Sequence, residues 1–227
     1  MICLFLGIWL LVIGYYSIVS FILDLIFPRF CYGCGQEGSY LCPACQAKIP
    51  TLPAKTSDSV EGVVNLFPYH PPLIDLVKDL KFGLVTDITQ SLAYFSISRL
   101  MSDFPNLVKY WQTHHFILVP IPLHYRRQNW RGFNQSELLG RQIASALNIG
   151  FENQVLNRRK STSPQSLQVS VASRSQNLHS AFSLTKPILS GNYLLFDDVS
   201  TSGATFTSAT SLFPKSCSLW CLSLCLG

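Results

Sequence analysis

Charged residues are scarce in this chain. Only 13% of its 227 residues are Asp, Glu, Lys or Arg, about half the usual share in a globular protein. Together with a hydrophobic content of 48%, this scarcity excludes a disordered, solvating chain. Glycine and proline are ordinary, at 13 residues each, so collagen-like and linker-dominated proteins are excluded as well.

Repeats and nucleotide-loop motifs are also lacking. The sequence has no internal repeat and no Walker-type G-x-x-x-x-G-K-[ST] motif, which argues against repeat architectures and P-loop proteins. The net charge is only +5, but the surplus is local: between residues 126 and 174, eight basic residues face only Glu137 and Glu152. A local basic surplus favours an anionic ligand.

The chain opens with an uncharged apolar run, residues 2–23. As a helix, this run is long enough to cross a hydrocarbon core of about 30 Å. A signal peptide is disfavoured because no basic residue precedes the run. Three interpretations stay open: a membrane anchor, a helix packed on the body, or an opening segment upstream of the true start. Because the first basic residues follow the run, we expect the body in the cytoplasm, anchored or free.

Four cysteines form two C-x-x-C pairs separated by seven residues: Cys31, Cys34, Cys42 and Cys45. Paired knuckles of this kind are typical of a structural Zn²⁺ site, whose closed shell of four thiolates leaves no catalytic position. Reduced thiolates again favour a cytosolic compartment. A redox pair or buried free thiols are the alternatives. Cys217, Cys221 and Cys225 lie in an apolar segment and are expected in the core.

Apolar periodicity predicts alternating helices and strands after a connector at residues 50–59. The expected helices are 73–80, 88–101, 135–147 and 204–213, and the expected strands are 116–122, 192–196 and 217–226. Residues 161–178 read as a solvated loop around a weak helix. This alternation predicts an α/β fold with a parallel sheet.

The strongest functional signal is the segment Leu194–Thr205, LLFDDVSTSGAT. A buried strand precedes Asp197 and Asp198, and a turn of small residues then leads into a helix. Backbone N–H groups and hydroxyls in such a turn can hold a phosphate. The two acids can accept hydrogen bonds from sugar hydroxyls or hold Mg²⁺. The alternative is an acidic pair that merely caps the helix.

This segment resembles the phosphoribosyl-pyrophosphate (PRPP) motif of type I phosphoribosyltransferases. The resemblance implies that Asp197 and Asp198 bind the ribose hydroxyls of Mg²⁺-bound PRPP. It implies that the 5′-phosphate is bound by the six residues that follow, namely Ser200, Thr201, Ser202, Gly203, Ala204 and Thr205. Nothing in the sequence identifies the acceptor of a phosphoribosyl group, so PRPP binding is predicted and transferase activity is left open.

The rest of the chain is similar to the ComF-like (competence protein F) family of double zinc ribbon and phosphoribosyltransferase-like proteins. The similarity is carried by residues 22–28, 80–82, 119–124 and 131–135, and by the pattern of Gln165, Arg174, Asn177, Ala181 and Phe182. It implies a type I phosphoribosyltransferase-like domain at 56–227, after a zinc-ribbon module at 29–55 and an apolar helix at 1–28. The residues before about Phe21 have no counterpart in the family pattern.

Two functions follow from the basic stretches. Arg126, Arg127 and Arg131 are expected on a loop that faces the phosphate turn, and Arg131 and Arg174 are the candidates to bind pyrophosphate. Members of the ComF-like family are associated with DNA uptake, so the rival is a single-stranded DNA-binding protein that acts with DNA-uptake proteins. Tyr125, Trp130 and Phe133 would then stack on the bases.

Overall fold

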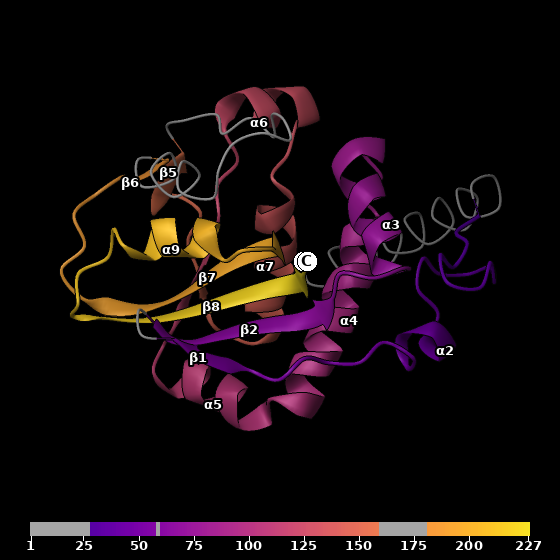
Figure 1. The fold of residues 1–227 in the computed structure, drawn as a ribbon, viewed down its shortest axis with the longest axis horizontal. Helices are drawn as coiled ribbons and strands as arrows, with labels where there is room; N and C mark the ends of the chain where they lie inside the picture. The colour runs from indigo at the N-terminus through magenta and orange to yellow at the C-terminus, as the bar shows by residue number, and fades with distance from the viewer. Residues whose placement is uncertain (1–27, 58–59, 159–180) are drawn as a thin grey trace, which may run out of the picture.

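The computed structural model describes residues 28–57, 60–158 and 181–227, and within them the chain forms a twisted sheet (Figure 1). The strand order is β1-β2-β8-β7-β3-β4, and a separate two-stranded sheet pairs β5 with β6. The strands are β1 (Lys55–Ser57), β2 (Val60–Pro68), β3 (Ile117–Pro120), β4 (Gly150–Phe151), β5 (Leu156–Arg158), β6 (Phe182–Leu184), β7 (Gly191–Ser200) and β8 (Cys217–Leu226).

Five of the six strands in the main sheet are parallel, and β1 pairs antiparallel with β2 at one edge. From β3 the chain proceeds outward to β4, whereas from β7 it proceeds to β8 on the other side. The connections therefore diverge between β3 and β7, which are neighbours. In an open parallel sheet, the carboxyl ends of two such strands enclose a crevice in which ligands bind.

Helices cover both faces of the sheet. The helical elements are α2 (Pro43–Gln46), α3 (Leu73–Lys78), the π-helical turn η1 (Asp79–Gly83), α4 (Ile88–Asp103), α5 (Pro105–Thr113), α6 (Tyr125–Arg131), α7 (Gln135–Ala146) and α9 (Ala204–Thr210). One core cluster joins residues of α4, α5 and α7 to the sheet, and a second joins α9 and the β5–β6 pair to the opposite face. The result is a layered α/β domain.

The cysteine segment packs against the first of these cores. Cys31, Leu41, Cys42, Cys45 and Ile49 are buried in the same cluster as residues of β2, α3 and α4. The first knuckle is a tight hairpin in which the N–H of Cys31 donates to the carbonyl of Gln36 at 2.8 Å, and the second knuckle leads into α2. The fold class is therefore confirmed: a parallel α/β sheet flanked by helices, preceded by a four-cysteine cluster.

Several local expectations differ from the structure. Strand β2 and helix α5 were not anticipated, and β7 extends through Ser200 instead of ending at Phe196. The residues expected as a basic loop after β3 form helix α6 instead. The apolar run at 2–23 and the segment 161–178 lie outside the described residues. In the part of the chain that the structure describes, no helix is long and apolar enough to cross a membrane.

Candidate functional site

The candidate site lies where β3 ends and β7 continues. Pro120, the last residue of β3, is in register with Phe196 of β7, and the N–H of Ile121 donates to the carbonyl of Phe196 at 2.8 Å. Beyond this point β7 has only β8 as a neighbouring strand, as far as Ser200. Asp197 and Asp198 are the first two residues past the end of β3, so they lie at the crevice between the diverging connections.

Asp198 is buried, with 3% of its surface exposed, and its charge is matched by a lysine. The Nζ atom of Lys81, on η1, lies 2.5 Å from Asp198 Oδ2, and Gln135 Nε2 donates to Asp198 Oδ1 at 3.2 Å. Burial of Lys81 opposes its charged form, but the charges of Asp198 and Asp197 outweigh burial and raise the pKa of Lys81. Lys81 therefore keeps its positive charge at neutral pH.

Asp197 is held by hydrogen bonds and has no direct cation among the contacts described. Ser136 Oγ donates to Asp197 Oδ1 at 2.8 Å, and the same oxygen accepts the N–H of Asp198 at 3.0 Å. Burial and the adjacent charge of Asp198 raise the pKa of Asp197. A carboxyl group of this kind holds its negative charge at a cost, so a ligand that donates hydrogen bonds to it relieves that cost.

The first turn of α7 supplies both polar partners of the acids. Asn134 caps this helix: its side-chain oxygen accepts the N–H of Ser136 at 3.1 Å, and its Nδ2 donates to the carbonyl of Ile121 at 3.0 Å. The second bond ties the start of α7 to the end of β3. The cap therefore places Gln135 and Ser136 beside the acids.

Arg131 is buried beside Gln135 and does not lie on an open loop. It is 8% exposed at the end of α6, its Nη1 donates to Gln135 Oε1, and its guanidinium carbon lies 5.6 Å from the centre of the Phe82 ring. Its Nε is buried and has no hydrogen-bond partner among the described residues. Burial lowers the pKa of Arg131, with a smaller opposing effect from Asp198. Arg131 thus reaches Asp198 through Gln135. Arg174 lies outside the described residues.

The predicted phosphate turn connects β7 to α9. Ser200 is buried and ends the strand, Thr201 and Ser202 are exposed, and Ala204 and Thr205 begin the helix. Gly203 has a φ of +72°, and a Cβ atom added there would meet nothing within 4 Å. A hollow of about 290 Å³ borders this turn on the side of β1 and β2, and neither acid lines it.

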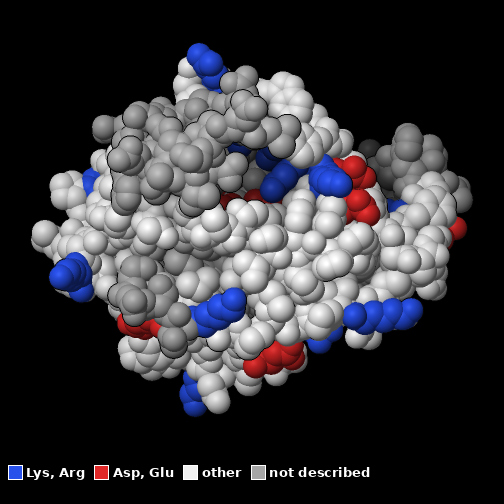
Figure 2. All heavy atoms as spheres, viewed as in Figure 1, with Lys and Arg blue, Asp and Glu red and all other residues white. Residues whose placement is uncertain are grey.

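Basic side chains gather around the crevice (Figure 2). His124, which caps α6, is buried, and its pKa is lowered by burial and then by the charges of Arg126, Arg158 and Arg127. The charge of Asp197 acts on Arg158 of β5, although burial and the charge of Arg127 lower the pKa of Arg158 overall. Arg126, Arg127 and Arg158 therefore lie close enough to act on His124, and we call these three residues the basic wall. An anion near them would meet a positive potential.

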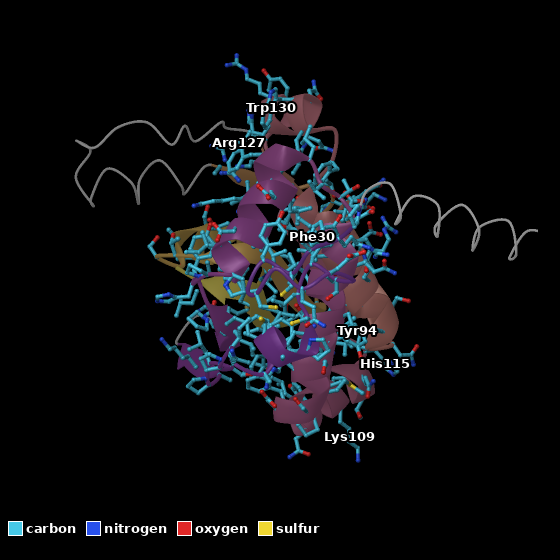
Figure 3. The ribbon with its side chains drawn as sticks, turned by 90° about the vertical axis from the view of Figure 1, so that its right-hand side faces the viewer. Phe30, Tyr94, Lys109, His115, Arg127 and Trp130 are labelled. Atoms are coloured by element: carbon cyan, nitrogen blue, oxygen red, sulfur yellow. The ribbon has the colours of Figure 1, made fainter. Side chains whose placement is uncertain are left out.

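Aromatic side chains stand exposed at the mouth of the crevice. Trp130 and Phe82 are each 63% exposed, with ring centres 6.5 Å apart, and Tyr125 is 57% exposed. Figure 3 shows Trp130 and Arg127 at the top of the molecule, on α6. Phe133 is different because it is partly buried against the main core. Tyr125 and Trp130 are therefore the more accessible of the three aromatic residues, and stacking of Phe133 on a ligand stays a prediction.

The four predicted metal ligands come together. The Sγ atoms of Cys31, Cys34, Cys42 and Cys45 all lie within 4.8 Å of one another. Those of Cys34 and Cys42 are 3.6 Å apart, close to the separation of about 3.8 Å that follows from a tetrahedron with Zn–S bonds of about 2.3 Å. Burial opposes ionisation of Cys31, but backbone N–H groups, that of Cys42 first, lower the pKa of this thiol. The cluster can bind a metal ion such as zinc.

Sequence reasoning did not single out three residues of the site: Lys81, Gln135 and Ser136. A signal was present for two of them, because Lys81 and Gln135 fall in the segments 80–82 and 131–135 that resemble the ComF-like family. Ser136 carried no such signal. Its role follows from its place in the first turn of α7, next to β7.

The fold and the site define a class: an α/β protein with two acids at the switch point of a parallel sheet and a four-cysteine cluster that can bind a metal ion. Comparison with known proteins shows which family of proteins the chain resembles. It is 30% identical over 199 residues to the DNA utilization protein YhgH of Salmonella typhimurium, covering 80% of this chain and 83% of that protein. Identity to the protein of that name in Escherichia coli K12 is 26% over 206 residues, or 85% and 82% of the two chains.

A third relative is competence protein F of Haemophilus influenzae, 33% identical over 196 residues that cover 83% of this chain and 80% of that protein. The chain belongs to the ComF-like family. A scan against models of protein families gives no match.

Proposed function

We propose that this protein binds PRPP–Mg²⁺ in the crevice between β3 and β7. Asp197 and Asp198 accept hydrogen bonds from the ribose hydroxyls, and the turn from Ser200 to Thr205 binds the 5′-phosphate. The observation that carries the proposal is the position of the two acids just past the end of β3, with Lys81 matching only one of their charges. An uncompensated carboxylate favours a ligand that brings hydroxyl donors and a cation.

The basic wall lies where it could attract the pyrophosphate group of PRPP. Arg131 and Arg174 are proposed for the pyrophosphate, with the charges of Arg127 and Arg158 nearby. In a transfer reaction, the bond from ribose C1 to pyrophosphate would break as a bond to the acceptor forms, and pyrophosphate would leave with its electron pair. Positive charge that develops at the ribose would be stabilised by the acids, and negative charge on the leaving group by the arginines.

Zinc is the proposed ion of the four-cysteine cluster. The four sulfur atoms fit a tetrahedral shell, which would be closed and would serve structure and not catalysis. Thiolate ligands must stay reduced, which supports the cytoplasmic location predicted for the body of the protein.

Calorimetric titration of PRPP–Mg²⁺ tests the proposed pocket. We expect Asp197→Asn and Asp198→Asn to weaken binding about ten- to a hundredfold, because each removes a charged acceptor for a ribose hydroxyl. The control is Asp103→Asn at the end of α4, which changes a carboxylate that accepts from Ser102 Oγ at 2.6 Å and pairs loosely with Arg99 at 3.9 Å. Affinities unchanged in both pocket variants, or no binding by the unaltered protein, would reject the proposal.

Single-stranded DNA is the second candidate ligand, and the exposed aromatic side chains at the crevice mouth favour it. Tyr125, Trp130 and Phe82 lie among arginines, with Arg126 5.9 Å from the ring centre of Tyr125. Stacking on aromatics combined with phosphate contacts is how proteins bind single strands. The relatives named for DNA utilization and competence support a role of this protein in handling DNA, together with DNA-uptake proteins.

Trp130→Ala separates the two candidates. Loss of a stacked base should weaken DNA binding roughly five- to a hundredfold, whereas PRPP affinity should change little. The Asn variants of the acids should leave DNA binding equal or stronger, because they remove negative charge beside the basic wall. If Trp130→Ala leaves oligonucleotide affinity unchanged at low salt, this surface does not bind DNA by stacking.

A further inference from the structure

The cysteine cluster and the acidic crevice are joined by one short element, η1. Tyr32, which follows Cys31, donates from its hydroxyl to Asp79 Oδ2 at 2.5 Å. Asp79 opens η1, and Lys81, two residues later, forms the 2.5 Å ion pair with Asp198. Two side-chain contacts, joined by the backbone of η1, therefore connect the first cysteine loop to Asp198.

We propose that Tyr32 is a positioning residue for the crevice: by holding Asp79, it fixes η1 so that Lys81 reaches Asp198. The four-cysteine module is then a part of the ligand pocket and not an appendage to it. This inference rests on the proposed PRPP pocket for its functional consequence, but the geometry it describes can be measured without PRPP.

Packing holds η1 in place. Leu80, between Asp79 and Lys81, is fully buried in the main core. The turn is π-helical, and Leu84, the residue that follows it, has a left-handed φ of 57°. Single π-helical turns are uncommon and are often found at functional sites, because they direct side chains that a regular helix would point elsewhere. A displacement of Asp79 would therefore move Lys81 with it.

The cysteine loops are also held in place, by hydrogen bonds to α4 and β2. Arg99 of α4 donates to the carbonyls of Gln46 and Ile49 at 3.0 and 3.1 Å, and the N–H of Leu52 donates to the carbonyl of Leu66 in β2 at 2.9 Å. These bonds hold the second knuckle and the connector. The first knuckle, which carries Tyr32, is held to the second by the cysteine cluster and by the Tyr32 N–H, which donates to the carbonyl of Tyr40 at 3.1 Å. Loss of the metal would remove one of these two links and loosen the loop that positions the Tyr32 hydroxyl.

The consequence for the crevice is electrostatic. Without Lys81, Asp198 would be a buried carboxylate beside a second carboxylate, with only Gln135 as a partner. Removal of one member of a buried ion pair leaves an uncompensated charge, which is strongly unfavourable. The pocket would then repel an anionic ligand such as PRPP more strongly. Tyr32, although it does not line the crevice, would in this way set the affinity of the acids for their ligand.

The test is a double-mutant cycle between Tyr32→Phe and Lys81→Met in the full-length protein. Tyr32→Phe keeps the ring and removes only the hydroxyl. The matched control is Tyr110→Phe, which removes a tyrosine–carboxylate hydrogen bond of 2.9 Å to Glu61, at the amino end of β2 and away from the crevice. Asp79→Asn is the second variant, because it leaves the sequence of the cysteine loop intact. Zinc content is measured for every protein.

Two quantities are read. The first is PRPP–Mg²⁺ affinity, which we expect to fall about three- to tenfold in Tyr32→Phe and in Asp79→Asn, but not in Tyr110→Phe. In the Lys81→Met background, Tyr32→Phe should cause no additional loss, because it acts through Lys81. The second is the rate at which an amine-acylating reagent labels Lys81, followed by mass spectrometry without PRPP. This rate should rise in Tyr32→Phe and on removal of the metal.

Each outcome either supports or rejects the proposed coupling between Tyr32 and the crevice. Faster labelling with non-additive affinities confirms the coupling. Unchanged labelling in both Tyr32→Phe and Asp79→Asn, or affinity losses that add to that of Lys81→Met, overturns it. If the unaltered protein binds no PRPP but labelling rises as expected, the proposed ligand is wrong while the coupling between module and crevice stands.

Discussion

At the scale of single residues, the two acids of β7 are balanced differently. Asp198 is buried against Lys81, whereas Asp197 has hydrogen bonds but no direct cation among its described contacts. Burial and the neighbouring charge raise the pKa of Asp197. A carboxyl whose pKa is higher in the folded than in the unfolded state costs stability as pH rises through that interval. Ionisation of Asp197 therefore lowers the stability of the unliganded protein.

Asp197→Asn should consequently stabilise the unliganded protein at neutral and alkaline pH. Each unit of pKa difference corresponds to about 1.4 kcal/mol, and 1 kcal/mol shifts Tm by roughly 2–4 °C in a domain of this size. We expect a Tm several degrees higher at pH 8, and little gain near pH 3.5, where the carboxyl is mostly protonated in both states. A thermal scan at several pH values measures this, and a gain that is the same at every pH would contradict it.

The site residues that could be predicted from the sequence are those that lie close together in it. The acids and the turn after them form one continuous segment, and the cysteines have a spacing imposed by a shared ion. Lys81, Gln135 and Ser136 reach the acids from two other elements, over sequence separations of at least 61 residues. Such contacts depend on how the elements pack, which local patterns do not encode.

At the scale of elements, the same distinction explains what was missed. Helix α6 has the sequence YRRQNWR, which has no apolar face, so periodicity could not reveal it. It is held at its ends, by His124 accepting the N–H of Arg126 and by Gly132 in a left-handed conformation. Strand β2 is buried on both faces and lies next to a Pro/Ser-containing connector, so it lacks the alternation of a half-exposed strand.

Helix α7 packs closely against the sheet at Gly140. There, close packing and helix propensity have opposite effects on the stability of an alanine variant. Gly140 sits in the middle of α7, and a Cβ atom there would lie 2.8 Å from Leu118 Cδ2 and 3.2 Å from Phe196 Cδ1. Gly→Ala in a helix normally gains about 1 kcal/mol, but overpacking costs about 1–3 kcal/mol. We expect Gly140→Ala to be less stable to urea, by up to about 2 kcal/mol.

Ser145→Ala is the control for this helix, because Ser145 is exposed on α7 and only propensity changes there. It should be neutral or slightly stabilising. A Gly140→Ala variant more stable than the unaltered protein would show that α7 does not approach the sheet as closely as described, and the placement of Gln135 and Ser136 would need revision.

The metal module gives a second prediction at this scale. Cys34→Ser should lose the bound zinc and lower the stability of the N-terminal segment, because three thiolates no longer close the shell. Cys217→Ser, outside the cluster and partly exposed on β8, should keep its zinc. Metal analysis of freshly reduced protein measures both. A protein that contains no zinc before any substitution would refute the assignment.

At the scale of the whole molecule, the cysteine segment and the α/β sheet share one hydrophobic core. The sheet fixes where the crevice lies, through the divergence of the chain between β3 and β7. Three separate elements, η1, the first turn of α7 and the end of β7, then bring their polar residues to that crevice. The domain division at residue 55 stays a prediction of the sequence, and the shared core indicates that the two parts fold together.

The crystal structure of the protein with PRPP and Mg²⁺ is the measurement that tests the central claim most directly. The account predicts ribose hydroxyls within hydrogen-bond distance of the Asp197 and Asp198 carboxylates, and the 5′-phosphate in the turn from Ser200 to Thr205. Crystals grown at saturating PRPP in which this crevice holds no ligand, or in which PRPP binds away from the two acids, would contradict it.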